Sequence, residues 1–201
     1  MRALALPRRS PYSRTMTRDE AIALLNELIA NRNLRYHGLA CEAVMRGLYR
    51  RFGERAEGSE EDWALVGLLH DADYEVTEKS EERHTEVVAE RLRPLGVDPL
   101  IIAAIQGHAD KAPRDTLMAK AIYAADELTG LIVAAALVRP DRKLAGLELE
   151  SVLRRFREPA FARGANREMI RTCESELGVP LADFCGIALE AMKGIAGEIG
   201  L

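Results

Sequence analysis

The sequence predicts an all-α fold, a helical bundle with a central buried helix and a helical extension at its C-terminal end. Apolar residues recur every three or four positions along most of the chain, helix-start signals precede these stretches, and no stretch alternates like a half-buried strand. Of the 201 residues 48% are hydrophobic but only 5% aromatic, which is typical of helices that pack through aliphatic faces. We therefore expect one domain over residues 17–201, with a core of about 20–140 and a helical tail of 141–201.

Residues 1–16 are expected to form a disordered extension before this domain. The segment is rich in arginine, contains no acidic residue, and lacks an apolar stretch as long as that of a secretory signal. A helix-start signal follows Met16 directly. The sequence therefore leaves open whether the native protein begins at Met1 or at Met16.

The first two helices are predicted from periodicity and from local start and stop signals. Thr17 and Glu20 have the spacing of a capping box, and apolar residues then recur at helical spacing to about Ala30. A second periodic stretch covers about 34–52, and it stops at Gly53. We expect a helix in each stretch.

Three further helices are predicted before the most apolar segment of the chain. Ser59 is a typical N-cap for a helix that ends at about His70. Residues 81–93 are periodic and precede a proline. An Asp98-Pro99 pair then places an N-cap before a proline at the first helical position, which predicts a fifth helix.

The most apolar segment covers about 115–138 and predicts the central buried helix. Lys120, Asp126 and Glu127 fall within it, and charges are costly in lipid, so a membrane span is not expected. The tail is predicted to add three shorter helices, at about 147–156, 166–177 and 181–199.

Charge and cysteine content restrict the class of partner. A net charge of -4 gives no broad basic surface for nucleic acid, so a small molecule is the expected partner. The cysteines Cys41, Cys173 and Cys185 lack the spacing of a metal knuckle or a redox pair and are expected to be buried, reduced thiols. We therefore expect a cytoplasmic protein that binds neither nucleic acid nor membrane.

The chain has only four histidines, and each lies on the apolar side or at the end of a different predicted helix. A single histidine in such a place is more often a hydrogen-bonded core residue than a ligand. Four of them together favour a shared site. They are His37, His70, His84 and His108.

Asp126 adds a carboxylate on a face of the central helix that is expected to be buried. A lone buried carboxylate is costly unless it is neutralised, paired or bound to a metal. Imidazole and carboxylate together suit divalent transition metals such as Mn, Fe, Co, Ni or Zn. The adjacent His70 and Asp71 end an apolar helix, and a fraying last turn would let both side chains reach one ion.

The order His37, then His70-Asp71, then Asp126 resembles the H…HD…D signature of the HD-domain superfamily of metal-dependent phosphohydrolases. The resemblance covers roughly residues 20–140 and implies an HD-domain helical bundle. Some stretches are similar to a bacterial subgroup of predicted HD hydrolases, namely HTEVVAERL, GHADKAP and YAADELTGLIVAAALVRP.

The resemblance also implies a ligand set. One ion would be held by the four signature residues, and in two-metal members two further histidines, here His84 and His108, hold a second ion while Asp71 bridges. Whether this chain holds one ion or two stays open at this point, because His84 and His108 could instead contact a substrate phosphate.

The implied activity is hydrolysis of a small phosphorylated substrate, a phosphomonoester or phosphodiester that could be a nucleotide, by a metal-bound hydroxide. Asp71 is the implied catalytic residue because it would orient that hydroxide. Two alternatives stay open, a di-iron oxygenase of the same superfamily and a non-catalytic regulatory domain that binds metal or nucleotide. Cyclic-dinucleotide chemistry is not favoured, because HDADYE lacks the lysine that often follows the doublet in those enzymes.

Other residues near these positions could support the site, although the sequence identifies no substrate-binding residue and no oligomeric state. Carboxylates that could orient the imidazoles are Glu42, Asp73 and Glu127. Cations that could bind phosphate are Lys79, Lys111, Lys120 and the tail residues Arg154, Arg155, Arg157, Arg163 and Arg167.

Overall fold

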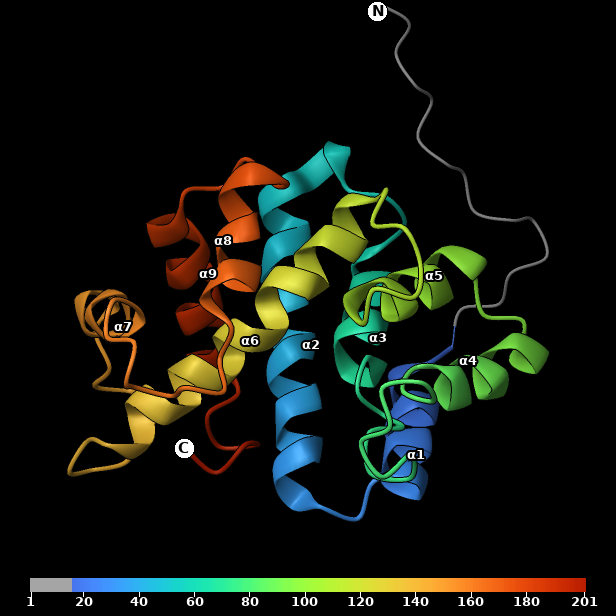
Figure 1. Ribbon diagram of the computed structural model, residues 1–201, viewed down its shortest axis with the longest axis horizontal. Coiled ribbons are helices and arrows are strands. Elements are labelled where there is room, and N and C mark those ends of the chain that lie inside the picture. Colours follow the sequence, from blue (N-terminus) through green and yellow to red (C-terminus); the bar gives the residue numbers. More distant parts are fainter. Residues whose placement is uncertain (1–15) are drawn as a thin grey trace, which may run out of the picture.

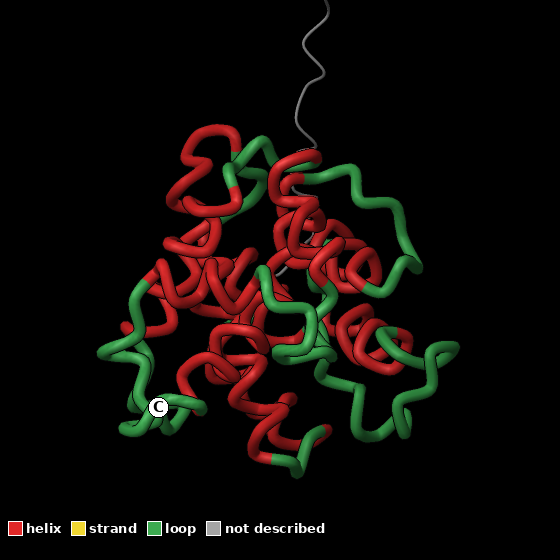
Figure 2. The backbone as a smooth tube through the Cα atoms, turned by 60° about the vertical axis from the view of Figure 1, so that its left-hand side comes forward, coloured by secondary structure: helices red, strands yellow, loops and turns green. Residues whose placement is uncertain are grey.

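The computed structural model describes residues 16–201, and helices joined by loops make up this part of the chain (Figures 1 and 2). No strand occurs among these residues, so the all-α prediction is confirmed. No helix of the described part is long and apolar enough to cross a membrane. Most of the extension that we expected at 1–16 lies outside the described residues.

The helices follow the predicted order. The α-helices are α1 (Arg18–Leu28), α2 (Arg32–Phe52), α3 (Glu60–Leu69), α4 (Glu86–Leu92), α5 (Pro99–His108), α6 (Leu117–Leu137), α7 (Leu149–Phe156), α8 (Arg167–Ser175) and α9 (Leu181–Gly194). Two short 3₁₀ helices follow α2 and α4, at Gly53–Arg55 and Arg93–Leu95.

Side-chain caps begin the helices where the sequence places them. Thr17 and Glu20 form both hydrogen bonds of a capping box at α1. Ser59 forms the same motif with the third residue of α3. Asp98 accepts from the backbone N–H of Leu100 at the start of α5. Each cap satisfies N–H groups that the first turn of a helix leaves without a backbone partner, which is why these boundaries could be predicted.

Helix α6 is the central element of the fold. It runs across the middle of the molecule, with α2 beside it, α5 on one side and α8 on the other (Figure 1). Twelve of its residues are buried, among them Ile122, Leu128 and Leu131. The predicted central buried helix is therefore confirmed. One apolar cluster joins α6 both to the predicted core and to the tail, from Met16 to Ile199.

Two glycines let α2 and α3 approach each other closely. A Cβ atom on Gly67 would lie 2.5 Å from the carbonyl oxygen of Cys41, and one on Gly38 would lie 2.8 Å from the carbonyl oxygen of Leu68. Any larger residue at either position would push the helix backbones apart. The close crossing places His37, the residue before Gly38, opposite the C-terminal end of α3.

Three boundaries differ from the sequence prediction. Residues 81–85 form turns rather than the first turn of a helix, because α4 begins at Glu86. Helix α9 ends at Gly194, and turns replace the expected helix as far as residue 199. Met16, which we assigned to the extension, is buried in the core.

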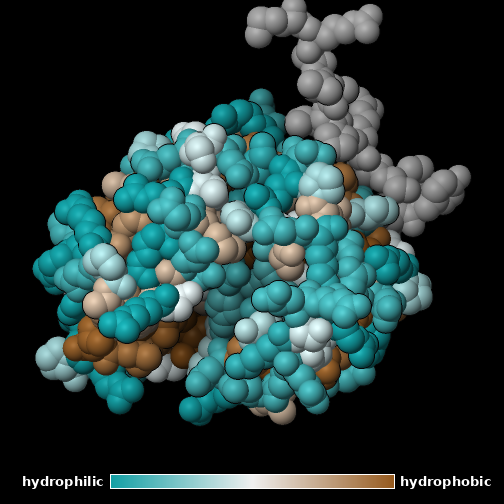
Figure 3. Space-filling view, in the orientation of Figure 1, coloured by the Kyte–Doolittle hydropathy of each residue, from teal (hydrophilic) through white to brown (hydrophobic). Residues whose placement is uncertain are grey.

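Most of the surface seen in Figure 3 is hydrophilic, as expected for a chain in which 30% of the residues are charged. A hydrophobic area lies at the lower left of this view, where Figure 1 places the C-terminal end of α6. Leu137 and Val138 are exposed there, by 40% and 58%. The central helix thus emerges from the core at this end.

Candidate metal centre

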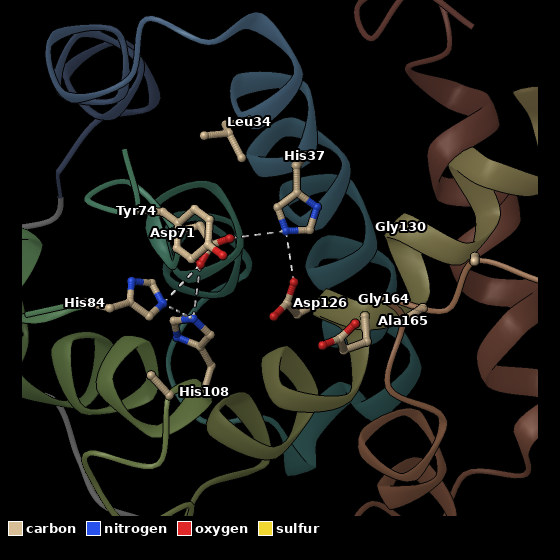
Figure 4. Close-up of a pocket in the computed structure, with 13 residues that line it drawn as sticks. Leu34, His37, Asp71, Tyr74, His84, His108, Asp126, Gly130, Gly164 and Ala165 are labelled. Carbon is tan, nitrogen blue, oxygen red and sulfur yellow. Dashed lines mark hydrogen bonds and ion pairs between the residues drawn. The ribbon is translucent and has the colours of Figure 1, made fainter. Parts of the chain in front are cut away.

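The six residues grouped by the sequence come together beside one hollow of about 560 Å³. Five of them line it (Figure 4), and the sixth, His70, is fully buried behind them. The residues come from five segments of the chain. These are α2 (His37), the end of α3 (His70 and Asp71), the turn before α4 (His84), the end of α5 (His108) and α6 (Asp126).

One group of side chains joins α2, α3 and α6. His37 Nε2 lies 2.9 Å from Asp126 Oδ1 and 3.2 Å from His70 Nε2. His70 Nε2 lies 3.5 Å from the same oxygen of Asp126. Asp126 lies on a partly open face, because Gly130, one turn further along α6, is exposed and lines the hollow. The buried face that we expected is thus the edge of a cavity.

A second group lies on the other side of Asp71. His84 Nε2 and His108 Nε2 are 3.1 Å apart. Both nitrogens face Asp71 Oδ1, at 3.2 Å and 3.3 Å. Asp71 Oδ2 faces the first group instead, at 3.6 Å from His37 Nε2 and 3.7 Å from His70 Nε2. The two oxygens of this carboxylate therefore serve two different pairs of imidazoles, as the dashed lines of Figure 4 show in part.

Backbone carbonyls fix the rings of two of the histidines. His70 Nδ1 lies 2.8 Å from the carbonyl oxygen of Gly67, and His108 Nδ1 lies 2.5 Å from that of Ile105. A carbonyl only accepts, so each Nδ1 must carry the proton that it donates. Both Nε2 atoms are left as lone-pair donors that face the site.

Side chains fix the other two rings. His84 Nδ1 donates to Asp73 Oδ1 at 2.9 Å. His37 Nδ1 donates to Thr129 Oγ1 at 3.1 Å, and the Thr129 hydroxyl donates onward to the carbonyl oxygen of Asp126 at 2.8 Å. All four histidines thus hold Nδ1–H on an outer acceptor and turn Nε2 inward, which is the arrangement of metal-ligating histidines.

The spacing of these inward atoms fits a common cation. Two neutral imidazoles that turn lone pairs toward each other at 3.1–3.2 Å repel unless a cation lies between them. Ligand bonds of about 2.0–2.1 Å at right angles put neighbouring ligand atoms about 3 Å apart. The donor set of imidazole nitrogens and carboxylate oxygens therefore fits a divalent transition metal.

When no metal cation is bound, the carboxylates of the site raise the pKa values of His70 and His84. Burial opposes a charge on His70, but the nearby carboxylates, Asp71 foremost, outweigh it and raise the pKa of His70 to about 10. Burial likewise opposes a charge on His84, and hydrogen bonds to Asp71 and Asp73 raise its pKa to about 9. Burial would raise the pKa of Asp71, yet the surrounding imidazoles hold it well below its usual range. The carboxylates thus attract positive charge strongly.

His84 does not lie on a helix, contrary to our expectation. Asp73, which is fully buried, explains its position. One Asp73 oxygen accepts from His84 Nδ1 and from the backbone N–H of Thr85, and the other accepts from the N–H of Val88 in the first turn of α4. Thr85 adopts a left-handed conformation, φ 68°. The carboxylate of Asp73 thus caps α4 from outside and turns His84 toward the site.

The other two carboxylates considered as imidazole partners have different roles. Glu42 is buried against the guanidinium groups of Arg18 and Arg46, so its expected role is wrong. Glu127 lines the hollow, and its Oε2 accepts from the backbone N–H of Asn166. Partial burial raises the pKa of Glu127.

None of the lysines and tail arginines considered for phosphate contacts is among the residues that line the hollow. Lys79 lies over the ring of Tyr74, Lys111 donates to the backbone carbonyl of Glu82, and Lys120 is not among the residues that line the hollow. The Arg167 guanidinium donates to the carbonyls of residues 161, 162 and 165, at 2.5–2.6 Å. Arg167 thus holds the tail loop in shape.

That tail loop, residues 157–166, forms a wall of the hollow that the sequence did not reveal. Ala162, Gly164 and Ala165 line the hollow from the tail, and Figure 4 labels the last two. Small residues in a loop give no periodic pattern, so no signal pointed to them. The Asn166 N–H contact with Glu127 ties the wall to α6.

Two polar residues behind His37 were also missed. Thr129 is fully buried, and Cys41 Sγ lies 3.5 Å from its hydroxyl and 3.9 Å from His37 Nε2. Cys41 belongs with His37, His70 and Asp126 to a group whose ligand atoms all lie within 4.8 Å of one another. The helical spacings, four residues from His37 and three from Asp126, were the available signals.

Comparison with known proteins identifies part of the chain. Residues 34–131 match the family model described as the HD domain. The matched segment runs from the start of α2 into α6 and contains all six residues of the candidate centre, whereas the tail loop lies outside it. No curated protein and no solved structure matched the chain.

Proposed function

We propose that the chain, whose residues 34–131 match the HD-domain family model, is a metal-dependent hydrolase of the HD-domain superfamily that acts on a small phosphorylated substrate, either a phosphomonoester or a phosphodiester. One observation supports this most strongly. Four imidazoles, each with Nδ1–H held by an outer acceptor, turn Nε2 toward the two carboxylates of Asp71 and Asp126.

The residues present fit one or two divalent ions, and we propose two. His37, His70 and Asp126 would hold one ion, His84 and His108 the other, and Asp71 would contribute one oxygen to each. Candidate metals are Mn, Fe, Co, Ni and Zn. Bound ions supply a water of lowered pKa and polarise a phosphoryl oxygen.

The protein's own residues would orient the reactants. Asp71 lies between the two pairs of imidazoles, so its carboxylate sets the position of whatever occupies the space between them. Thr129 and Asp73 keep the His37 and His84 rings from rotating, which lowers the cost of reaching a reactive geometry. The hollow beside them has room for a small molecule.

The proposal is tested with Asp71→Ala. Metal-loaded protein should release phosphate from at least one member of a panel of nucleotides and sugar phosphates, and the variant should fall to background, because it loses the shared carboxylate. Asp141→Ala, an exposed substitution, is the matched control and should keep full activity.

Two results would contradict the proposal. Undiminished turnover by Asp71→Ala would place the chemistry elsewhere. Oxygen consumption without phosphate release would indicate oxygenase chemistry instead.

A further inference from the structure

The outer part of the hollow has an unusual composition for a phosphate pocket. Beyond the candidate ligands it is lined by small or apolar residues, by Tyr74 and by a single charged side chain, Glu127. Neither Lys nor Arg is among the lining residues in the part of the chain that the structure describes. Arg163 lies in the tail loop, but it is exposed and does not line the hollow.

The charge balance then limits what can bind. Three carboxylates line the hollow, those of Asp71, Asp126 and Glu127. Two divalent ions would bring four positive charges, so about one positive charge would remain for a ligand. A phosphomonoester dianion already exceeds this by about one negative charge. A second phosphate would add negative charge beside Glu127 with no cation to balance it.

Glu127 is also held in place. Its Oε2 accepts the N–H of Asn166 at 3.0 Å, at the end of the loop that Arg167 holds by several backbone carbonyls. A fixed carboxylate at the wall can accept hydrogen bonds from hydroxyl or amino groups, and it repels anions.

We propose that this site takes phosphomonoesters of compact compounds that carry hydroxyl or amino groups, and that Glu127 is the specificity-determining residue that excludes substrates with a second phosphate. This inference rests on the proposed hydrolase function. It assigns a role to the junction between α6 and the tail loop, where Glu127 of the matched HD segment contacts Asn166, which lies outside that segment.

Glu127→Gln separates charge from structure, because a glutamine oxygen can still accept the Asn166 N–H. Metal-loaded wild type should show at least about tenfold higher kcat/KM for a nucleoside 5′-monophosphate than for its diphosphate, or for a hexose 6-phosphate than for its 1,6-bisphosphate. At pH 8 the substitution should reduce this preference about tenfold, as expected for one nearby charge.

Binding gives a readout that does not depend on turnover. Glu127→Gln should strengthen binding of methylenebisphosphonate to the metal-loaded protein about tenfold and change that of methylphosphonate less than about twofold. Arg163→Gln is the matched control. It should leave the affinities for the two phosphonates unchanged, and also the preference for monophosphates over diphosphates.

The outcomes are distinguishable. Equal use of mono- and diphosphates by wild type, or an unchanged preference in Glu127→Gln, would overturn the inference and leave the hydrolase function standing. Selective loss of diphosphate turnover in Arg163→Gln would overturn it too, because Arg163 would then recruit polyphosphates. If no ester were hydrolysed at all, the proposed function would fall and the inference with it.

Discussion

The two halves of the candidate centre have similar spacing between their ligand atoms, but different structural elements hold those ligands in place. In the helix half, His37, His70 and Asp126 lie on α2, at the end of α3 and on α6, three elements of the buried core. In the loop half, His108 ends α5 and His84 lies in a turn. The Nε2 atoms are 3.2 Å apart in the helix half and 3.1 Å apart in the loop half.

The difference shows how equal ligand spacing can be reached in two ways. The helix half depends on close backbone packing, because Gly38 and Gly67 let α2 and α3 touch. The loop half depends on one buried carboxylate, Asp73, which holds both His84 and the start of α4. We therefore expect packing changes to damage the helix half and polar changes to damage the loop half.

Gly67→Ala should have the largest effect of the substitutions compared below. The new Cβ would meet the backbone of α2, which cannot move aside without separating His37 from His70. We expect a loss of about 3 kcal/mol in the free energy of unfolding, the upper end of typical overpacking costs. Urea denaturation of metal-free protein measures this.

Gly194→Ala is the matched control, because a Cβ there meets nothing within 4 Å. Gly194 ends α9, so alanine should be neutral or stabilise by up to about 1 kcal/mol. Equal stability of the two variants would show that the α2–α3 crossing is not tight.

Asp73→Asn should affect the loop half alone. An amide cannot accept from His84, Thr85 and Val88 together, because one of its two polar atoms is a donor. Calorimetric metal titration should show one of two binding events weakened about 10–100-fold, the usual effect of losing such an outer partner. Loss of both events in equal measure would mean that the halves are not independent.

In the metal-free protein the raised histidine pKa values of both halves should make the Tm depend on pH. This effect should be smaller than those of the substitutions above. The pKa of His70 is raised to about 10 and that of His84 to about 9, whereas unfolded histidine titrates near about 6.5. A raised pKa stabilises the fold fully below the unfolded value, and this stabilisation is lost as the pH rises through the folded value. The Tm of chelated protein should therefore fall between about pH 6.5 and 10.

Saturating metal should reverse this trend over the same range. Metal binding requires deprotonated imidazoles, so its affinity rises with pH. A Tm that follows the same pH curve with and without metal would contradict the placement of the ion on these histidines.

The two halves were also unequally predictable from the sequence. Helix starts at Thr17, Ser59 and Asp98 could be predicted because capping uses local side chains. The end of α3 at the His70-Asp71 doublet followed from an apolar run that stops there. Of these caps, Ser59 begins α3 in the helix half and Asp98 begins α5, which carries His108 of the loop half, so local signals located ligand-bearing helices of both halves.

The turn that carries His84 and the outer wall could not be predicted in the same way. Residues 81–85 are periodic enough to predict helix, but Asp73 takes the N–H groups of Thr85 and Val88 and sets the start of α4. The wall residues of the tail are tied to α6 by the contact between Glu127 and Asn166, which are 39 residues apart, while Arg167 holds the loop in shape through nearby carbonyls. Contacts between segments far apart in the chain leave no local pattern.

The number of ions per chain tests the central claim most directly, namely that each half holds one ion and Asp71 joins them. Elemental analysis of metal-replete protein should find about two ions in wild type and about one in a His84→Ala, His108→Ala double variant, as expected for a binuclear centre with ions about 3.5–4 Å apart. One ion per chain in both proteins would contradict the claim and make His84 and His108 contacts for the substrate.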